Sequence, residues 1–123
     1  MKIDLIYTIV PCIDTLIASQ FYKRVLNFKS LKESGDELLV EVNNNLKLKL
    51  EENEEYTNNM YTFKVDIEYF NLIVSNMKKE KIYFGSNIND LEDMKIYEDF
   101  EKKEFYIIDP NSHLFQIVTF IEN

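Results

Sequence analysis

The sequence predicts an α+β fold in which two βαβββ halves make up one domain of residues 1–123. Three observations lead to this prediction. Runs of β-branched and apolar residues flank two helical stripes, the order of elements repeats once along the chain, and 123 residues suit a single domain. An apolar fraction of 46% is enough for a packed core. The halves are expected to cover about residues 1–52 and 58–123.

The first half begins with a strand over residues 3–10, which Pro11 is expected to end. Asp14 is a helix N-cap candidate because its carboxylate can accept hydrogen bonds from the free amides of the first turn. The helix should span about 13 residues, and its apolar stripe consists of Ile17, Phe21, Val25 and Phe28. Three strands should follow, at residues 29–33, 38–42 and 46–50, with turns at 35–36 and 43–45.

The second half follows a polar connector over residues 51–59. A strand over 60–65 precedes a helix that starts at Asp66 or Ile67. The buried stripe of this helix should be Phe70, Ile73, Val74 and Met77. Residues 85–103 should hold one strand that the pattern does not locate. Two strands close the chain, at 104–108 and 114–120, joined by a turn at 109–112.

Composition excludes several classes of function. A net charge of −8 argues against nucleic-acid binding, which needs a basic face. No uncharged apolar stretch reaches the roughly 18 residues of a membrane span. The single cysteine, Cys12, cannot form an internal disulfide, which fits a reducing compartment. We therefore expect a cytoplasmic protein with neither a nucleic acid nor a membrane as partner.

The count of elements predicts a binding face. Two helices cannot cover both faces of eight strands, and an apolar sheet face must be buried against something. One face of the strands must therefore meet the other half, a partner chain or a ligand.

Two segments carry a resemblance to a known family. Residues 21–28 (FYKRVLNF) resemble a helix end of the vicinal oxygen chelate superfamily, which includes glyoxalase I, extradiol dioxygenases and bleomycin-binding proteins. Residues 105–113 (FYIIDPNSH) resemble the turn before the last strand of that family, and residues 63–66 (FKVD) are a weaker match. Asn27 and Ser112 stand where the family has glycine. The resemblance covers essentially the whole chain and implies a curved mixed sheet with a concave ligand-binding face and outer helices.

The resemblance also implies where a metal would bind in metal-dependent members. The corresponding positions here are Tyr7, Met60 and Gln116, with a fourth near Lys47 or Lys49. A phenol, a thioether and an ammonium group are poor ligands for a hard divalent cation, and only Gln116 could coordinate, through its carbonyl oxygen. We therefore predict no metal and no cofactor.

The remaining reactive side chains give little sign of catalysis. His113, the only histidine, is interpreted as a turn or strand-start residue, with a role as general base or ligand as the alternative. Cys12 is interpreted as a structural thiol, because no basic partner is visible. We predict no catalytic residue.

Strand alternation predicts a ligand surface. If Tyr7 faces the concavity, then Met60, Thr62 and Gln116 face it too, and Tyr106 is a further candidate. These five residues make a mostly apolar surface with a few polar groups, as small-molecule pockets usually have. The alternative is that they pack the two halves together or form a dimer seam.

The function predicted from these features is metal-independent binding of a small molecule. By resemblance to the bleomycin-binding branch, the chain would sequester an aromatic or cationic compound as a homodimer, and acidic charge with aromatic side chains would suit such a ligand. Two alternatives stay open. One is a metal-dependent lyase or dioxygenase of the same superfamily, and the other is an interaction module whose concavity is filled by protein.

Overall fold

The computed structural model of the chain describes residues 8–34, 37–43, 46–53 and 55–121. The predicted site residue Tyr7, the predicted turn at 35–36 and residues 44–45 of the turn predicted at 43–45 lie outside these ranges. The chain divides into two compact units, Met1–Thr57 and Asn58–Asn123. The division falls within the polar connector, and each unit is described by itself below.

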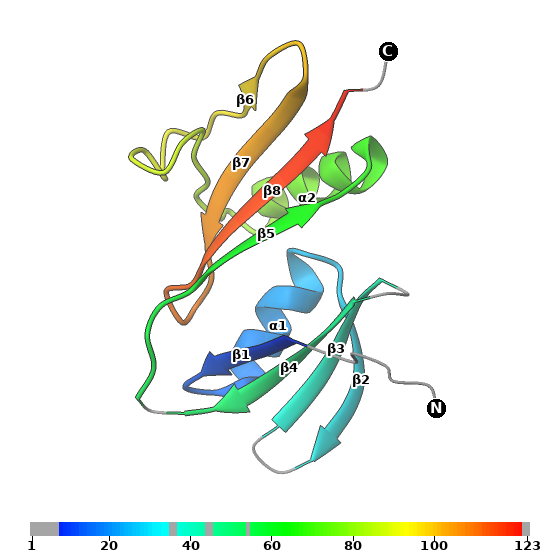
Figure 1. Cartoon of the computed structure of the whole chain (residues 1–123), viewed down its shortest axis with the longest axis vertical. Coiled ribbons are helices and arrows are strands. Elements are labelled where there is room, and N and C mark those ends of the chain that lie inside the picture. The colour runs from blue at the N-terminus through cyan, green and yellow to red at the C-terminus, as the bar shows by residue number, and fades with distance from the viewer. Residues whose placement is uncertain (1–7, 35–36, 44–45, 54, 122–123) are drawn as a thin grey trace, which may run out of the picture. The chain divides into compact units, whose positions relative to one another are not determined.

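The first unit contains one helix and a four-stranded mixed sheet (Figure 1). Its elements are β1 (Thr8–Cys12), α1 (Thr15–Arg24), β2 (Lys29–Ser34), β3 (Glu37–Asn43) and β4 (Leu46–Glu52). The strand order is β1-β4-β3-β2, in which β1 and β4 are parallel and the other pairs are antiparallel. This is the predicted βαβββ order.

Pro11 does not end the first strand, which is a correction to the sequence-based expectation. The strand continues through Pro11 to Cys12, and Pro11 lies opposite Glu51 of β4. Since β1 is at the edge of its sheet, a residue without a backbone N–H can occupy it without breaking a ladder on both sides. Strand β4 likewise extends to Glu52, into the segment expected to be connector.

Helix α1 is capped as predicted, and its apolar stripe is confirmed in part. The Asp14 carboxylate accepts hydrogen bonds from the amides of Leu16 (2.8 Å) and Ile17 (3.2 Å). The helix has 10 residues, not about 13, and of the predicted stripe Val25 and Phe28 are buried whereas Ile17 is 55% exposed. The buried residues within the helix are Ala18, Ser19 and Tyr22. The fully buried Tyr22 ring lies beside Phe28, so the buried face of the helix is turned from Ile17 toward Ala18 and Tyr22.

The second unit repeats the order of elements (Figure 1). It contains β5 (Met60–Lys64), α2 (Ile67–Lys79), β6 (Tyr97–Glu98), β7 (Lys102–Ile108) and β8 (Leu114–Phe120). The strand order is β5-β8-β7-β6, with β5 and β8 parallel and the other pairs antiparallel. The strand that the sequence could not locate is the two-residue β6, and β7 starts two residues earlier than predicted.

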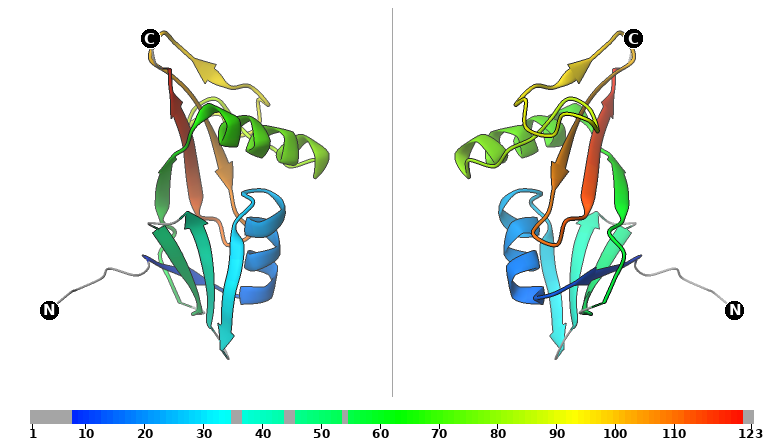
Figure 2. Two further views of the ribbon diagram at one scale, coloured as in Figure 1. Left: turned by 90° about the vertical axis from the view of Figure 1, so that its right-hand side faces the viewer. Right: turned by 90° about the vertical axis from the view of Figure 1, so that its left-hand side faces the viewer.

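Helix α2 covers one face of the second sheet, as Figure 2 shows. Asp66 is its N-cap and accepts from the Tyr69 amide at 2.8 Å. The four residues of the predicted stripe are all buried, which confirms that prediction. The Phe70 ring lies 5.0 Å from the ring of Phe105 on β7, so the helix packs on the face of β7 that carries Phe105.

The turn between β7 and β8 fixes the register of these two strands. The Asp109 carboxylate accepts from the amides of Asn111 (2.9 Å) and His113 (2.8 Å), and the Ser112 amide donates to the Asp109 carbonyl at 3.0 Å. Ser112 has a φ of 65°, in the left-handed region where the family has glycine. Asn27 at the end of α1 has a φ of 60°, so both departures from glycine keep the left-handed conformation.

Candidate functional site

The second sheet has one face that α2 covers and one that it does not. Because side chains alternate along a strand, the register that places Phe105 under α2 assigns every second residue to the opposite face. We call that opposite face the open face. Its residues are Met60, Thr62 and Lys64 of β5, Tyr97 of β6, Lys102, Glu104, Tyr106 and Ile108 of β7, and Leu114, Gln116, Val118 and Phe120 of β8.

Four of the five predicted ligand residues lie on the open face. Thr62 and Tyr106 are the two cross-strand neighbours of Gln116, one on each side. Met60 is two residue pairs further along, opposite Leu114, and is 50% exposed. Tyr7 lies outside the described residues, so its place beside these four stays a prediction.

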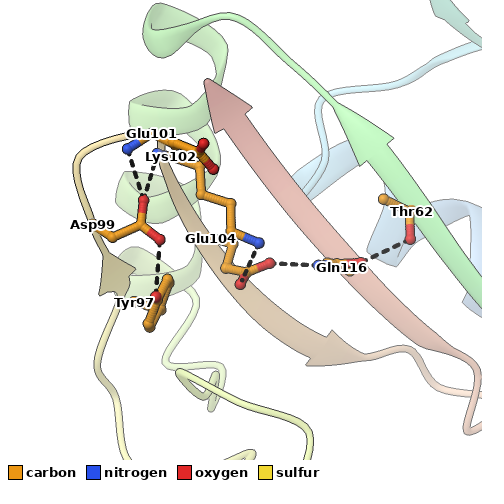
Figure 3. Close-up of polar contacts among 7 residues, drawn as sticks. All are labelled: Thr62, Tyr97, Asp99, Glu101, Lys102, Glu104 and Gln116. Carbon is orange, nitrogen blue, oxygen red and sulfur yellow. Dashed lines mark hydrogen bonds and ion pairs between the residues drawn. The ribbon is translucent and has the colours of Figure 1, made fainter. Parts of the chain in front are cut away.

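A chain of polar contacts crosses the open face over three strands (Figure 3). The Thr62 hydroxyl donates to the Gln116 side-chain carbonyl at 2.9 Å. The Gln116 amide nitrogen donates in turn to the Glu104 carboxylate. The second oxygen of that carboxylate lies 3.2 Å from the Lys102 ammonium nitrogen. We call these four residues the polar chain. Both ends of the Gln116 carboxamide are engaged, so the orientation of this side chain is fixed.

The outer end of the polar chain is held by the hairpin of β6 and β7. The Asp99 carboxylate accepts from the backbone amides of Glu101 (2.8 Å) and Lys102 (3.0 Å) and from the Tyr97 hydroxyl at 2.9 Å (Figure 3). These donors, the Glu101 amide first, lower the pKa of Asp99. The Lys102 ammonium also lies over the Tyr97 ring, 5.9 Å from its centroid. Lys102 is therefore positioned between an aromatic ring and a carboxylate.

Electrostatics on the open face favour neutral tyrosine and charged lysine. The pKa of Lys102 is raised by the hydrogen bond and the charge attraction between Lys102 and Glu104. Burial, and then the Glu104 charge, raise the pKa of Tyr106. The hydrogen bond to Asp99 raises the pKa of Tyr97. At neutral pH both phenols keep their protons and can act as hydrogen-bond donors.

The residues of the open face do not fit a catalytic divalent metal. Gln116 has a suitable carbonyl oxygen, but this oxygen already accepts the Thr62 hydroxyl. Glu104 is the one carboxylate among the described residues of this face, and an ammonium group neutralises it at 3.2 Å. Within the described ranges, no three His, Cys, Asp or Glu side chains cluster as metal ligands would. A single neutral oxygen donor and a paired carboxylate do not make a metal site.

The two other reactive side chains have structural surroundings. His113 is fully buried at the start of β8, where its Nδ1 accepts from the Asn59 amide at 3.0 Å and its ring meets Tyr61 edge-on. This is the predicted strand-start role. Cys12 is buried at the end of β1, as a structural thiol would be.

A hollow of the second unit lies away from the polar chain. It has a volume of about 740 Å³ and is formed where β5 and β8 end, beside the start of α2. None of Met60, Thr62, Tyr106 and Gln116 lines it. The four described ligand candidates therefore are not part of this hollow, which belongs to a neighbouring part of the unit.

Sequence reasoning missed Glu104, Lys102 and Tyr97. Alternation back from Tyr106 places Glu104 and Lys102 on its face, so a signal for these two was present once the strand was recognised. Their charge led to no such assignment, because charged strand residues are usually solvated. No sequence pattern pointed to Tyr97, since a two-residue strand is too short to show periodicity.

Comparison with known proteins identifies the fold. No protein-family model and no curated protein matches the chain. Among solved structures, the oxidase ChaP-H2 is 22% identical with a TM-score of 0.84, covering 97% of this chain and 94% of that one. A glyoxylase/bleomycin resistance protein/dioxygenase domain from Frankia sp. EAN1pec is 13% identical with a TM-score of 0.69, covering 100% and 94%. The fosfomycin resistance protein FosX from Mesorhizobium loti is 14% identical with a TM-score of 0.67, covering 97% and 92%.

These likenesses confirm the resemblance and the α+β fold predicted from the sequence motifs. The chain has the fold of the vicinal oxygen chelate superfamily. Neither helix in the described ranges is long and apolar enough to cross a membrane. The homodimer and the cytoplasmic location stay predictions.

Proposed function

We propose that the chain binds a small aromatic molecule on the open face of its second sheet, without a metal ion. The observation that carries the proposal is the polar chain. Its contacts occupy the oxygen atoms that a metal would need, yet they leave the Tyr106 hydroxyl and apolar side chains available to an organic ligand. Small-molecule sites generally combine a few fixed polar groups with a larger apolar surface.

The exposed part of the open face is apolar and aromatic. Four large apolar side chains on it are substantially exposed, although the centre of the same face is buried at Glu104 and Val118. The four are Met60, Tyr97, Ile108 and Phe120. Grouped apolar exposure of this kind marks binding surfaces more often than scattered exposure does. Aromatic ligands can stack on such rings and contact the adaptable thioether of Met60.

The charge of the face favours the aromatic over the cationic ligand class. Its described residues include two lysines, Lys64 and Lys102, and one carboxylate, Glu104. The acidic excess of the whole chain is therefore not concentrated there. A cation would meet local repulsion from the lysines, whereas a neutral ring would not.

The experiment compares a neutral and a cationic probe of the same shape. Intrinsic tyrosine fluorescence, free of tryptophan in this chain, is followed while 1-naphthol or 1-naphthylmethylamine is added in buffer with EDTA. We expect saturable binding of the naphthol and weaker binding of the amine. Tyr106→Ala should weaken naphthol binding about three- to tenfold, since an aromatic contact contributes about 0.5–1.5 kcal/mol.

A matched variant controls for general effects of losing a tyrosine. Tyr83 is exposed and lies outside the open face, so Tyr83→Ala should leave naphthol binding unchanged. The proposal fails if Tyr106→Ala binds like the unaltered chain, or if binding appears only after a divalent metal is restored.

A metal-dependent enzyme is the second candidate, favoured by one observation. The fold is similar over nearly its whole length to ChaP-H2, whose name describes an oxidase. Elemental analysis of the purified chain separates the two candidates. Stoichiometric iron, manganese, nickel or zinc would support the enzyme, and metal-free protein that still binds naphthol would support the first proposal.

A further inference from the structure

Helix α1 has an apolar surface that the core of the first unit does not use. The helix lies on one face of its sheet and buries Ala18, Ser19 and Tyr22 there (Figure 1). Because an α-helix makes one turn every 3.6 residues, the opposite side of α1 is defined by its sequence. We call this side the outer face of α1, and its residues are Leu16, Ile17, Gln20, Lys23 and Arg24.

The first half of the outer face exposes large aliphatic side chains. Leu16 is 60% exposed and Ile17 is 55% exposed, and Ile13, one residue before the helix cap, is 64% exposed. The half-buried Phe21 lies one turn after Ile17 and extends the same surface. Three exposed aliphatic side chains within residues 13–17 are a grouped patch, and grouped patches mark interaction surfaces more often than scattered ones do.

The two ends of α1 carry exposed charges of opposite sign. The start carries Asp14 and Glu52, and the Glu52 carboxylate accepts hydrogen bonds from the amide and the hydroxyl of Thr15, each at 3.4 Å. The end carries Lys23 and Arg24. A second α1 that runs in the opposite direction would place each basic end beside an acidic start, whereas a parallel one would place like charges together. The surface is therefore complementary to a copy of itself that is turned by a twofold rotation.

We propose that the outer face of α1 binds a second copy of this chain, with the two α1 helices packed antiparallel about a twofold axis. An axis that crosses the helix between Ile17 and Gln20 places Ile17 of one copy against Phe21 of the other. The same axis brings Arg24 of each copy toward the acidic start of the other helix. The outer face shares no residue with the open face, so this inference does not depend on the proposed function.

The size of the contact predicts a weak dimer. A contact through one short helix buries less than the roughly 800 Å² per partner that a stable complex buries. We therefore expect a dissociation constant on the order of 10–100 µM. Such a dimer forms and dissociates within an accessible concentration range, so its affinity can be compared between variants.

The test is sedimentation velocity of the full chain from about 5 µM to about 500 µM, a range chosen to span the expected dissociation constant. About 0.15 M salt screens the general repulsion between chains that each have a net charge of −8. The average sedimentation coefficient should rise from the value of one chain toward that of two.

Ile17→Glu should weaken self-association at least about tenfold, because it places two like charges near the twofold axis. Ile17 is the third residue of a helix capped by Asp14, a position where glutamate favours the helix start, so the variant should keep its fold. Leu72→Glu is the matched control, since Leu72 is an exposed leucine on α2. It should self-associate like the unaltered chain.

A pair of charge reversals tests the antiparallel geometry. Arg24→Glu and Glu52→Lys should each weaken self-association about three- to tenfold, because each sets like charges together at both ends of its own dimer. An equal mixture of the two variants should recover the affinity of the unaltered chain to within about twofold, since each altered end then faces an opposite charge. Recovery on mixing cannot come from damage to the fold, because each chain keeps its own substitution.

Three results would overturn the proposal. One is a chain that sediments as a monomer over the whole concentration range. Another is a dimer that persists unchanged in Ile17→Glu, which would place the contact on a different surface. The third is a mixture of the two charge-reversed variants that associates no better than either variant alone.

Discussion

The two faces of the second sheet are made by alternate residues of the same strands, yet they differ in chemistry. The face under α2 is closed by stacked and tilted rings, in which Phe63 and Phe115 lie 5.6 Å apart and Phe105 contacts both Phe70 and Phe84. The open face carries the polar chain at its centre and exposed apolar side chains around it. The comparison teaches that one period-two alternation separates two kinds of surface, since the closed face supplies the packed core and the open face carries the surface proposed to bind a ligand.

The sharpest way to break this comparison is to truncate one side chain on each face of β7. Phe105 is fully buried on the closed face, and Ile108 is 45% exposed on the open face. Phe105→Ala should lower the free energy of unfolding by about 3–5 kcal/mol, through lost burial and an unfilled cavity. Urea denaturation measures the change.

Ile108→Ala is the matched control on the same strand. It should cost less than about 1 kcal/mol, because the side chain is already half in water. Costs of equal size for the two variants would show that the open face is part of the folding core, and the division of roles would be wrong.

The polar chain gives a second comparison, within the open face itself. Gln116→Ala removes both the amide that donates to Glu104 and the carbonyl oxygen that accepts from Thr62. It should lower the free energy of unfolding by about 1–2 kcal/mol. Thr62→Val breaks only the exposed hydrogen bond to Gln116 and should cost about 0.5–1 kcal/mol. Thermal unfolding of the two variants and of their double mutant measures the coupling. Strictly additive costs would mean that the hydrogen bond between Thr62 and Gln116 contributes nothing to stability.

The turn that joins β7 to β8 offers a smaller, stabilising change. Ser112 has a φ of 65°, a conformation that costs a residue with a side chain about 1–2 kcal/mol relative to glycine. Substitution by glycine would remove this cost, but part of the gain in stability is lost because glycine has more conformational freedom in the unfolded chain. Ser112→Gly should therefore stabilise the chain by about 0.5–1 kcal/mol in urea denaturation. Ser112→Ala should give no gain, and stabilisation by alanine would show that the hydroxyl and not the backbone is the cause.

Much of the fold could be predicted because its signals are local. The caps at Asp14 and Asp66 follow from the reach of a short carboxylate to first-turn amides, and the stripe of α2 follows from one unambiguous period. The stripe of α1 was predicted only in part, since Val25 and Phe28 are buried but Ile17 is exposed. Two apolar stripes overlap on that helix, one with Ile17 and the other with Ala18 and Tyr22. Periodicity cannot choose between overlapping stripes, whereas packing volume can.

The site could be predicted only in part, for a related reason. Thr62 and Gln116 were placed on one face by alternation, and they do form a hydrogen bond. The link from Gln116 to Glu104 joins β8 to β7 through a register that the sequence does not specify. The hollow beside α2 was not predicted, since its lining comes from the ends of β5 and β8 and the start of α2, which come together only through the parallel pairing of β5 with β8.

A last comparison concerns one tyrosine on each side of the sheet, Tyr69 and Tyr106. Their predicted effect on the free energy of unfolding appears only at alkaline pH. Burial raises the pKa of Tyr69, on α2, to about 12, from an ordinary value of 10.0. The unfolded chain thus loses this proton at lower pH than the folded chain does. The contribution of Tyr69 to the free energy of unfolding is complete below about pH 10 and declines as the pH rises from about 10 to about 12.

Urea denaturation between pH 8 and pH 11 measures this effect. The free energy of unfolding should fall with rising pH in the unaltered chain, and the fall should be shallower in Tyr69→Phe. Tyr106→Phe on the open face should reduce the same decline, because burial and Glu104 also raise the pKa of Tyr106. An unchanged decline in Tyr69→Phe would mean that the phenol on α2 is as well hydrated in the folded chain as in the unfolded one, and that the covered side of the sheet does not extend to this residue.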